Sequence, residues 1–302
     1  IKKKAIIKTT NHMPPLKTIP IIATSLAAII LFSLCLQYPF STTFPIGGDA
    51  PFYAKRAQAV LAINENPTNA IEALHVAWYP LSLVIFSTSA IFPASWPERF
   101  IWYMTASHII TGLILGRLLY KISGWQASAF VMINWAITTT GITGHVEDGT
   151  LAQLMSFMFL ALFLERISSG ASWTALFALA ATTLAHPVVG LTLLVTVVIA
   201  TPILLTTWPQ LNRNQRKQIV IICSAIALIL TLVVFTGKSV FANAPIITGV
   251  ASRPFIDTLV SRFAPFTALA PLGLLLLLHS NKPTTLKFII ATLFSISAIM
   301  AG

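Results

Sequence analysis

Asp49 is the first residue in the chain whose type and setting favour chemistry. It follows two glycines and precedes Pro51 in the stretch FPIGGDAPFYAK, residues 44–55. Glycines allow close backbone approach, and a carboxylate in such a loop can accept a proton from a hydroxyl group or bind a divalent cation. The same pattern also suits a helix cap, since Asp49 or Ala50 can precede a helix with Pro51 in its first turn. Both interpretations stay open.

A second group of ionisable residues occupies a short loop between two apolar stretches. His145, Glu147 and Asp148 lie in the hexapeptide GHVEDG, in a chain that has only 8 acidic residues. Ionisable groups at the edge of a membrane are candidates for catalysis, for proton transfer or for metal binding. The structural alternative is that Asp148 caps a helix that begins near Thr150.

His186 and several basic residues complete the set of candidates. His186 precedes Pro187 at the end of an apolar stretch, where a histidine is either a catalytic group or a hydrogen-bonded packing residue. Basic residues suit a phosphate or pyrophosphate group, with a solvated loop or lipid-headgroup anchoring as the alternative. The candidates for substrate binding are Lys55, Arg56, Lys238, Arg253 and Arg262.

Composition predicts the kind of element that positions these residues. The chain has 302 residues, of which 56% are hydrophobic and 9% are charged, whereas soluble domains carry about 25% charged residues. We therefore expect an all-α polytopic membrane protein. The net charge of +11 does not indicate nucleic acid as a partner, because the basic residues fall between apolar stretches and act as topology signals. Cys35 and Cys223 lie within apolar stretches, which argues against a disulfide framework.

About nine charge-free stretches approach the roughly 20 residues that a helix needs to cross a bilayer. They are residues 19–38, 100–118, 125–143, 151–164, 172–185, 188–205, 219–236, 265–278 and 288 onward. Residues 81–92, between Pro80 and Pro93, are too few to cross as one helix, and we predict that they lie at the interface or re-enter. With that segment excluded, most of the 19 Lys and Arg residues lie on the side of the N-terminus, which is therefore predicted to be cytoplasmic.

This topology divides the chain into a basic cytoplasmic N-terminus, residues 1–17, and a transmembrane domain, residues 18–302. Residues 39–99 form the first external loop, with juxtamembrane helices inside it. Asp49, the GHVEDG loop and His186 all fall on the external face, whereas Glu165, beside Arg166, is a charge at a cytoplasmic helix end. The chain starts without Met and stops inside an apolar run, so we expect a transmembrane domain truncated at its C-terminus.

Three of these sequences together resemble a known superfamily. The GGDAPFY loop, the GHVEDG loop and the LAHPVVG helix end, with a non-crossing YPLSLVIF segment between them, resemble the GT-C membrane glycosyltransferases over roughly residues 15–240. Within that superfamily, the chain looks most like the membrane proteins labelled 6-pyruvoyl-tetrahydropterin synthase-related.

The resemblance implies an activity and roles for particular residues. A GT-C enzyme transfers a sugar from a polyprenyl-phosphate or polyprenyl-pyrophosphate donor to an acceptor on the non-cytoplasmic face. The acid of the first loop, which matches Asp49, serves as base or metal ligand, and the second-loop acid, Glu147 or Asp148, assists it or holds the metal. The implied cofactor is a divalent cation, Mg²⁺ or Mn²⁺, bound by Asp49 and Asp148, although neither loop contains an Asp-x-Asp pair. The implied partners are a lipid-linked sugar donor and membrane lipids, and the implied location is the plasma (inner) membrane of a prokaryote.

Two other classes of function remain open on the sequence. A transporter or lipid flippase would use His145, Glu147 and Asp148 as an ion or proton relay. A non-catalytic membrane subunit would keep the scaffold alone. The position of the acids at the membrane edge, rather than at the midplane, favours the glycosyltransferase.

Overall fold

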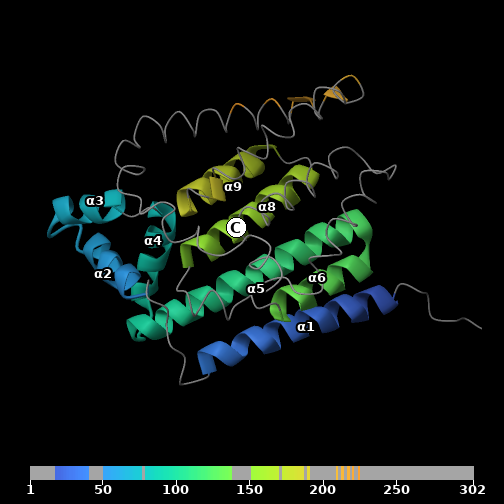
Figure 1. The fold of residues 1–302 in the computed structure, drawn as a ribbon, viewed down its shortest axis with the longest axis horizontal. Helices are drawn as coiled ribbons and strands as arrows, with labels where there is room; N and C mark the ends of the chain where they lie inside the picture. The colour runs from blue at the N-terminus through green and yellow to red at the C-terminus, as the bar shows by residue number, and fades with distance from the viewer. Residues whose placement is uncertain are drawn as a thin grey trace, which may run out of the picture.

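The structure is a computed structural model, and every element that it describes is a helix (Figure 1). The described residues are 18–40, 50–76, 79–137, 151–169, 172–186 and 189–190, with isolated positions between 209 and 224. The predicted all-α class is confirmed for this part of the chain.

Five long helices lie side by side and form the body of the described structure (Figure 1). They are α1 (Thr18–Phe40), α5 (Trp96–Ser123), α6 (Trp125–Ile137), α8 (Leu151–Ser168) and α9 (Ser172–Ala185). The central helix is α5, because α1, α6 and α8 all pack against it. α9 packs against α8 on the side away from α5.

Four shorter elements gather at one end of this body. They are α2 (Ala50–Leu61), α3 (Pro67–Val76), α4 (Pro80–Ser87) and the 3-10 helix η1 (Thr88–Ile91). Figure 1 shows α2, α3 and α4 at the end of the body where α5 begins and α9 finishes. α4 connects these short helices to the body, since it packs against α2 as well as against α8 and α9.

The end of α1 and the start of α5 lie at this same end of the body. The rings of Phe40 and Trp102 meet edge to face with their centroids 5.7 Å apart, and Leu31 packs against Gly112 farther along the same pair of helices. The two helices are therefore antiparallel, and the segment that joins them returns to the end from which it departs. A segment that does not cross the membrane must begin and end on the same side in this way. The side of the membrane on which this end of the helices lies stays a prediction.

Local sequence explains where α5 begins and ends. Ser95 Oγ accepts a hydrogen bond from the backbone N–H of Glu98, and Glu98 Oε2 accepts one from the backbone N–H of Ser95 at 2.7 Å, which is a capping box. At the other end, Gly124 has φ 91°, in the left-handed region that favours glycine. α6 begins at the next residue, so α5 and α6 form a tight helical hairpin.

Two described helices are long and apolar enough to cross a membrane, judged by length and composition alone: residues Thr18–Gln37 within α1, and α8. The predicted stretches 19–38, 151–164 and 172–185 coincide with α1, α8 and α9, and 100–118 lies within α5. The stretch 81–92 is occupied by α4 and η1, a helical segment shorter than a membrane span, and its place at the interface stays a prediction.

All the predicted membrane spans stay predictions, and several of the stretches extend beyond the described residues. The stretch 125–143 is helical as far as Ile137, and its later residues lie outside the described part of the chain. The stretches 188–205, 219–236, 265–278 and 288 onward also lie outside it, apart from isolated positions.

Gly112 and Gly116 allow α1 and α6 to approach α5 closely. A Cβ atom added at Gly112 would lie 2.7 Å from Leu31 Cδ2 of α1 and 3.0 Å from Trp135 Cδ1 of α6, and one at Gly116 would lie 2.8 Å from Met132 Cγ of α6. All three distances are shorter than van der Waals contact between carbon atoms. The four-residue spacing places both glycines on one face of α5, which is the arrangement of close helix pairs in membranes.

Gly112→Leu is therefore expected to destabilise the protein, because the new side chain must displace Leu31 and Trp135. The expected cost is about 1–3 kcal/mol of unfolding free energy. The measurement is thermal unfolding of the detergent-solubilised chain, followed by circular dichroism. Ala106→Leu, at an exposed position of the same helix, is the control. An equal loss of stability in the two variants would contradict the close approach at Gly112.

Candidate functional site

The start of α2 is fixed to the start of α8 by a buried tyrosine. Tyr53 is 1% exposed, and its hydroxyl accepts a hydrogen bond of 2.9 Å from the backbone N–H of Ala152. Ala152 lies in the first turn of α8, where the backbone N–H groups have no acceptor within their own helix. α2 therefore supplies one of the acceptors that the start of α8 needs.

Aromatic packing holds Tyr53 in position. Its ring stacks on that of Tyr79, with the centroids 4.7 Å apart and an interplanar angle of 23°. On its other sides it meets Phe86 of α4 edge to face at 6.2 Å and Phe100 of α5 at 5.5 Å. The hydroxyl is thus aimed at α8 by contacts with two other helices.

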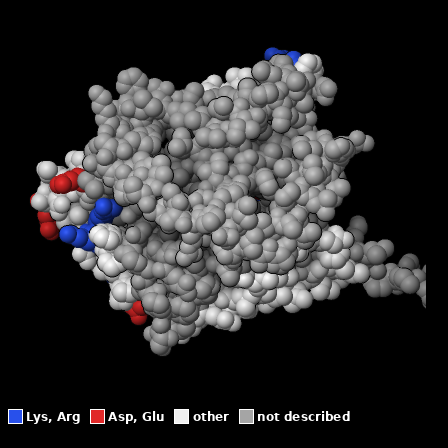
Figure 2. Space-filling view, in the orientation of Figure 1, with Lys and Arg blue, Asp and Glu red and all other residues white. Residues whose placement is uncertain are grey.

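Charged side chains border this aromatic group. Arg56, on the next turn of α2 after Tyr53, is half-buried, and its Nη1 donates a hydrogen bond of 3.2 Å to the hydroxyl of Tyr79. Lys55 is exposed. Figure 2 shows basic and acidic side chains together over α2 and α3.

His186 directly follows α9 and reaches the same core. Its backbone N–H donates to the carbonyl of Thr182, and Ser82 of α4 donates a hydrogen bond of 3.1 Å to the carbonyl of Ala185. Ala185 belongs to the same hydrophobic cluster as Tyr53 and Leu151, the first residue of α8. The beginnings of α2 and α8 and the end of α9 therefore converge on one cluster.

The imidazole of His186 is uncharged at neutral pH. Its Nδ1 atom is buried and has no hydrogen-bond partner among the described residues. Burial lowers the pKa of His186 to about 4. A neutral imidazole keeps one nitrogen able to accept a proton or a hydrogen bond.

Only three of the predicted site residues fall within the described part of the chain. Arg56 and His186 border the convergence of helix ends, whereas Lys55 lies on the outer surface of α2. The other predicted site residues lie outside the described residues: Asp49, His145, Glu147, Asp148, Lys238, Arg253 and Arg262. The beginnings of α2 and α8 nevertheless adjoin some of these residues in sequence. α2 begins immediately after Asp49, and α8 begins three residues after Asp148.

A metal site is not visible in the described part of the structure. Among these residues, no group of three or more His, Cys, Asp or Glu side chains lies close together. The predicted ligands Asp49 and Asp148 are outside this part of the chain. Binding of Mg²⁺ or Mn²⁺ therefore stays a prediction.

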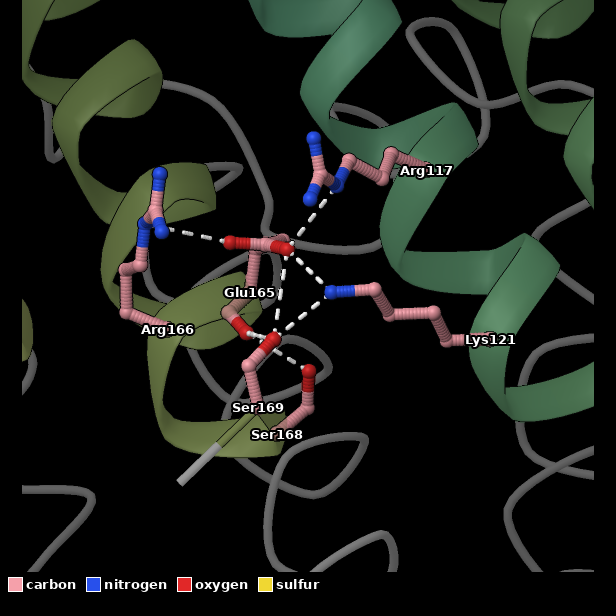
Figure 3. Close-up of polar contacts among 6 residues, drawn as sticks. All are labelled: Arg117, Lys121, Glu165, Arg166, Ser168 and Ser169. Carbon is pink, nitrogen blue, oxygen red and sulfur yellow. Dashed lines mark hydrogen bonds and ion pairs between the residues drawn. The ribbon is translucent and has the colours of Figure 1, made fainter. Parts of the chain in front are cut away.

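A second polar cluster lies at the opposite end of α5 and α8 (Figure 3). The side chain of Glu165 is 3% exposed, and its Oε1 accepts a hydrogen bond from Lys121 Nζ and lies 3.1 Å from Arg117 Nε. Its Oε2 lies 3.3 Å from Arg166 Nε. Three cations thus surround one buried carboxylate. Arg117 and Lys121 come from the last turns of α5, so the C-terminal ends of α5 and α8 lie together.

Two features of these clusters are not predicted from the sequence. The adjacency of Glu165 and Arg166 in sequence suggests their pairing, which is confirmed, but it gives no indication of the two cations of α5. The four-residue spacing of Arg117 and Lys121 places them on one face of α5 and is a signal that would have suggested a shared partner. The hydrogen bond of Tyr53 to α8 had no signal in the sequence, because its partner is a backbone group 99 residues away. His108 is buried and stacked on Trp135, with its Nε2 3.0 Å from the Trp135 carbonyl oxygen.

Comparison with known proteins finds no match among family models, curated proteins or solved structures. The GT-C resemblance therefore rests on the short sequences GGDAPFY, GHVEDG, LAHPVVG and YPLSLVIF.

Tyr53→Phe is expected to destabilise the protein while preserving its packing. The substitution removes the acceptor of the Ala152 N–H group and leaves a buried donor unpaired, which costs about 1–3 kcal/mol. The measurement is the midpoint of thermal unfolding in detergent. Tyr120→Phe is the matched control, because Tyr120 is 49% exposed on α5. Equal midpoints for Tyr53→Phe and wild type would show that the hydrogen bond to α8 contributes nothing.

His186 is expected to make the stability of the protein depend on pH. Its pKa is about 4 in the folded state and 6.5 in the absence of burial, so the folded state binds fewer protons between these values. The free energy of unfolding is therefore expected to fall as the pH decreases from 6.5 toward 4, by about 3 kcal/mol at most. His186→Gln should lose this contribution, so the unfolding free energy of the wild type minus that of the variant should be larger at pH 7.5 than at pH 5, as measured by thermal unfolding at both pH values. A constant difference would exclude titration of His186.

Proposed function

We propose that the chain is a membrane glycosyltransferase of the GT-C type, with Asp49 as the catalytic base. The observation that carries the proposal is the hydrogen bond between Tyr53 and Ala152, 2.9 Å long. It joins the helix that follows Asp49 to the helix that follows His145, Glu147 and Asp148. Two acid-bearing segments that are far apart in sequence are thereby attached to one fixed point.

Chain connectivity strengthens this argument. Asp49 is bonded to the first residue of α2, and Asp148 is three residues from the first residue of α8. Three residues span at most about 11 Å. We therefore expect carboxylates of both segments to lie within reach of one substrate bound next to Tyr53. His186 directly follows Ala185, which belongs to the same hydrophobic cluster as Tyr53, and its imidazole is uncharged.

The proposed reaction is a single displacement at the sugar. Asp49 accepts the proton of the acceptor hydroxyl, whose oxygen forms a bond to the anomeric carbon as the bond from that carbon to the phosphate oxygen breaks. Basic groups stabilise the negative charge on the departing polyprenyl phosphate. Arg56 is the described candidate for that role, with Lys55, Lys238, Arg253 and Arg262 as the predicted ones. A divalent cation, if bound by Asp49 and Asp148, would supply further charge stabilisation.

The surface of α1 supports a membrane location for this chemistry. Apolar side chains of that helix are 41–65% exposed along much of its length, which suits contact with lipid rather than with water. They are Ile19, Ile21, Ile22, Leu26, Ile29 and Phe32. A polyprenyl tail in the same bilayer would present its phosphate at the end of the helices, where the candidate site lies.

The test is sugar transfer by the full-length protein in membranes, with radiolabelled polyprenyl-linked donors. Asp49→Asn is expected to reduce transfer by about 100-fold or more, because the amide cannot accept the proton. Glu65→Gln, which changes an exposed acid between α2 and α3, is the matched control and should transfer at the wild-type rate.

Two outcomes would contradict the proposal. Undiminished transfer by Asp49→Asn would remove Asp49 from the mechanism. Absence of transfer with every donor, together with proton-coupled uptake that Glu147→Gln abolishes, would identify a transporter.

A further inference from the structure

The cluster around Glu165 has more positive charge than its carboxylate can neutralise. Arg117, Lys121 and Arg166 carry three positive charges against one negative charge, and each of the three contacts Glu165 (Figure 3). One cation of α5 is enough to neutralise Glu165 and to join the two helices, and the cluster holds a second cation of α5 as well as Arg166 of α8. Two positive charges are left over at this end of the helices.

The arginines also keep most of their hydrogen-bond donors. The ion pairs of both guanidiniums with Glu165 are formed by Nε, at 3.1 Å for Arg117 and 3.3 Å for Arg166. Within the described part of the chain, the side chains of the two arginines form no hydrogen bond or ion pair with any group other than Glu165. The side chains are 66% and 39% exposed, so these donors are open to a ligand.

The buried carboxylate holds these donors in place. Glu165 is 3% exposed and lies between the two arginines, so its two oxygens fix one guanidinium on each side (Figure 3). Lys121 is fixed in turn by Glu165 and by Ser169, whose Oγ accepts a hydrogen bond of 2.7 Å from Nζ. Ordering the side chains before a ligand arrives reduces the entropy lost on binding.

We propose that this cluster, which we call the Glu165 cluster (Arg117, Lys121, Glu165 and Arg166), binds the phosphate of an anionic phospholipid. Planar guanidinium groups with free N–H donors match the geometry of phosphate oxygens. The cluster lies at the end of α8, an apolar helix long enough to cross a bilayer, and so at headgroup depth. The inference rests on the membrane location in the proposed function and is independent of sugar transfer.

The charge of the Glu165 cluster determines which phospholipids it favours. A net positive charge of two favours a headgroup with a net negative charge over zwitterionic phosphatidylcholine. The predicted topology places this end of the helices on the cytoplasmic side, where anionic lipids attract basic residues. Phosphatidylglycerol is therefore a suitable probe.

The experiment is a titration of the full chain in mixed detergent micelles, with the thermal unfolding midpoint as the readout. Phosphatidylglycerol should raise the midpoint in a saturable manner, whereas phosphatidylcholine, or inorganic phosphate at the same ionic strength, should not. Arg117→Gln and Arg166→Gln should each weaken the apparent affinity for phosphatidylglycerol about tenfold, since each removes a charge-assisted contact. Lys217→Gln, which removes an exposed cation elsewhere, should leave the affinity within about twofold of wild type.

Several results would overturn the inference. Equal effects of phosphatidylglycerol and phosphatidylcholine would show that the cluster does not select anionic lipid, and an equal effect of inorganic phosphate would show an anion site without lipid. An equal loss of affinity in Lys217→Gln would show non-specific attraction. Arginine variants that lower the midpoint by the same amount with and without lipid would show that the cluster only joins α5 to α8.

Conservative variants keep the test informative if the glutamine variants do not fold. Arg117→Lys and Arg166→Lys retain the charge but lose the planar donors, so they should fold and bind phosphatidylglycerol less tightly than wild type. Unchanged affinity in both lysine variants would contradict recognition by guanidinium groups.

Discussion

The backbone N–H groups at the start of α8 need acceptors, and the hydroxyl of Tyr53 supplies one at 2.9 Å. The rest of the candidate site depends on this requirement, because the tyrosine that satisfies it belongs to the helix that follows Asp49. Stacking on Tyr79 and packing against Phe86 and Phe100 leave the hydroxyl little freedom to turn away. The position of α2 is thus set by an interaction whose loss would leave a polar group buried without a partner.

Polar groups are buried in different ways at the two ends of the α5–α8 pair. At one end, the hydroxyl of Tyr53 and the imidazole of His186 are uncharged, so they are buried at moderate cost. At the other end, Glu165 is buried as part of an ionic cluster, which is tolerable because each oxygen faces a cation. Chemistry that transfers a proton suits the first end, and binding of an anion suits the second.

The sequence predicts the helices better than it predicts their contacts. Apolar runs free of charge mark α1, α8 and α9, because this signal is local. The same signal marks only residues 100–118 of α5, which extends at both ends to the capping box of Ser95 and Glu98 and to Gly124. The flanking prolines likewise indicate that residues 81–92 cannot form one crossing helix. The contact of Tyr53 with Ala152 is not predictable in this way, since any hydroxyl can accept from any unpaired N–H group. Glu165 was assigned its neighbour in sequence, whereas its partners on α5 depend on how two helices pack.

The separation in sequence between Tyr53 and Ala152 has a consequence for the order of assembly. α5 and α6 are joined by one residue, and α8 and α9 also follow each other closely, so each pair can form early from local contacts. The hydrogen bond of Tyr53 instead closes a loop of 99 residues and needs α8 to be in place already. During synthesis from the N-terminus, α2 emerges long before the helix that it must contact. The end of the molecule that holds the candidate site is therefore completed only after both helical hairpins have docked. A fragment of the chain that stops before α8 cannot form this site.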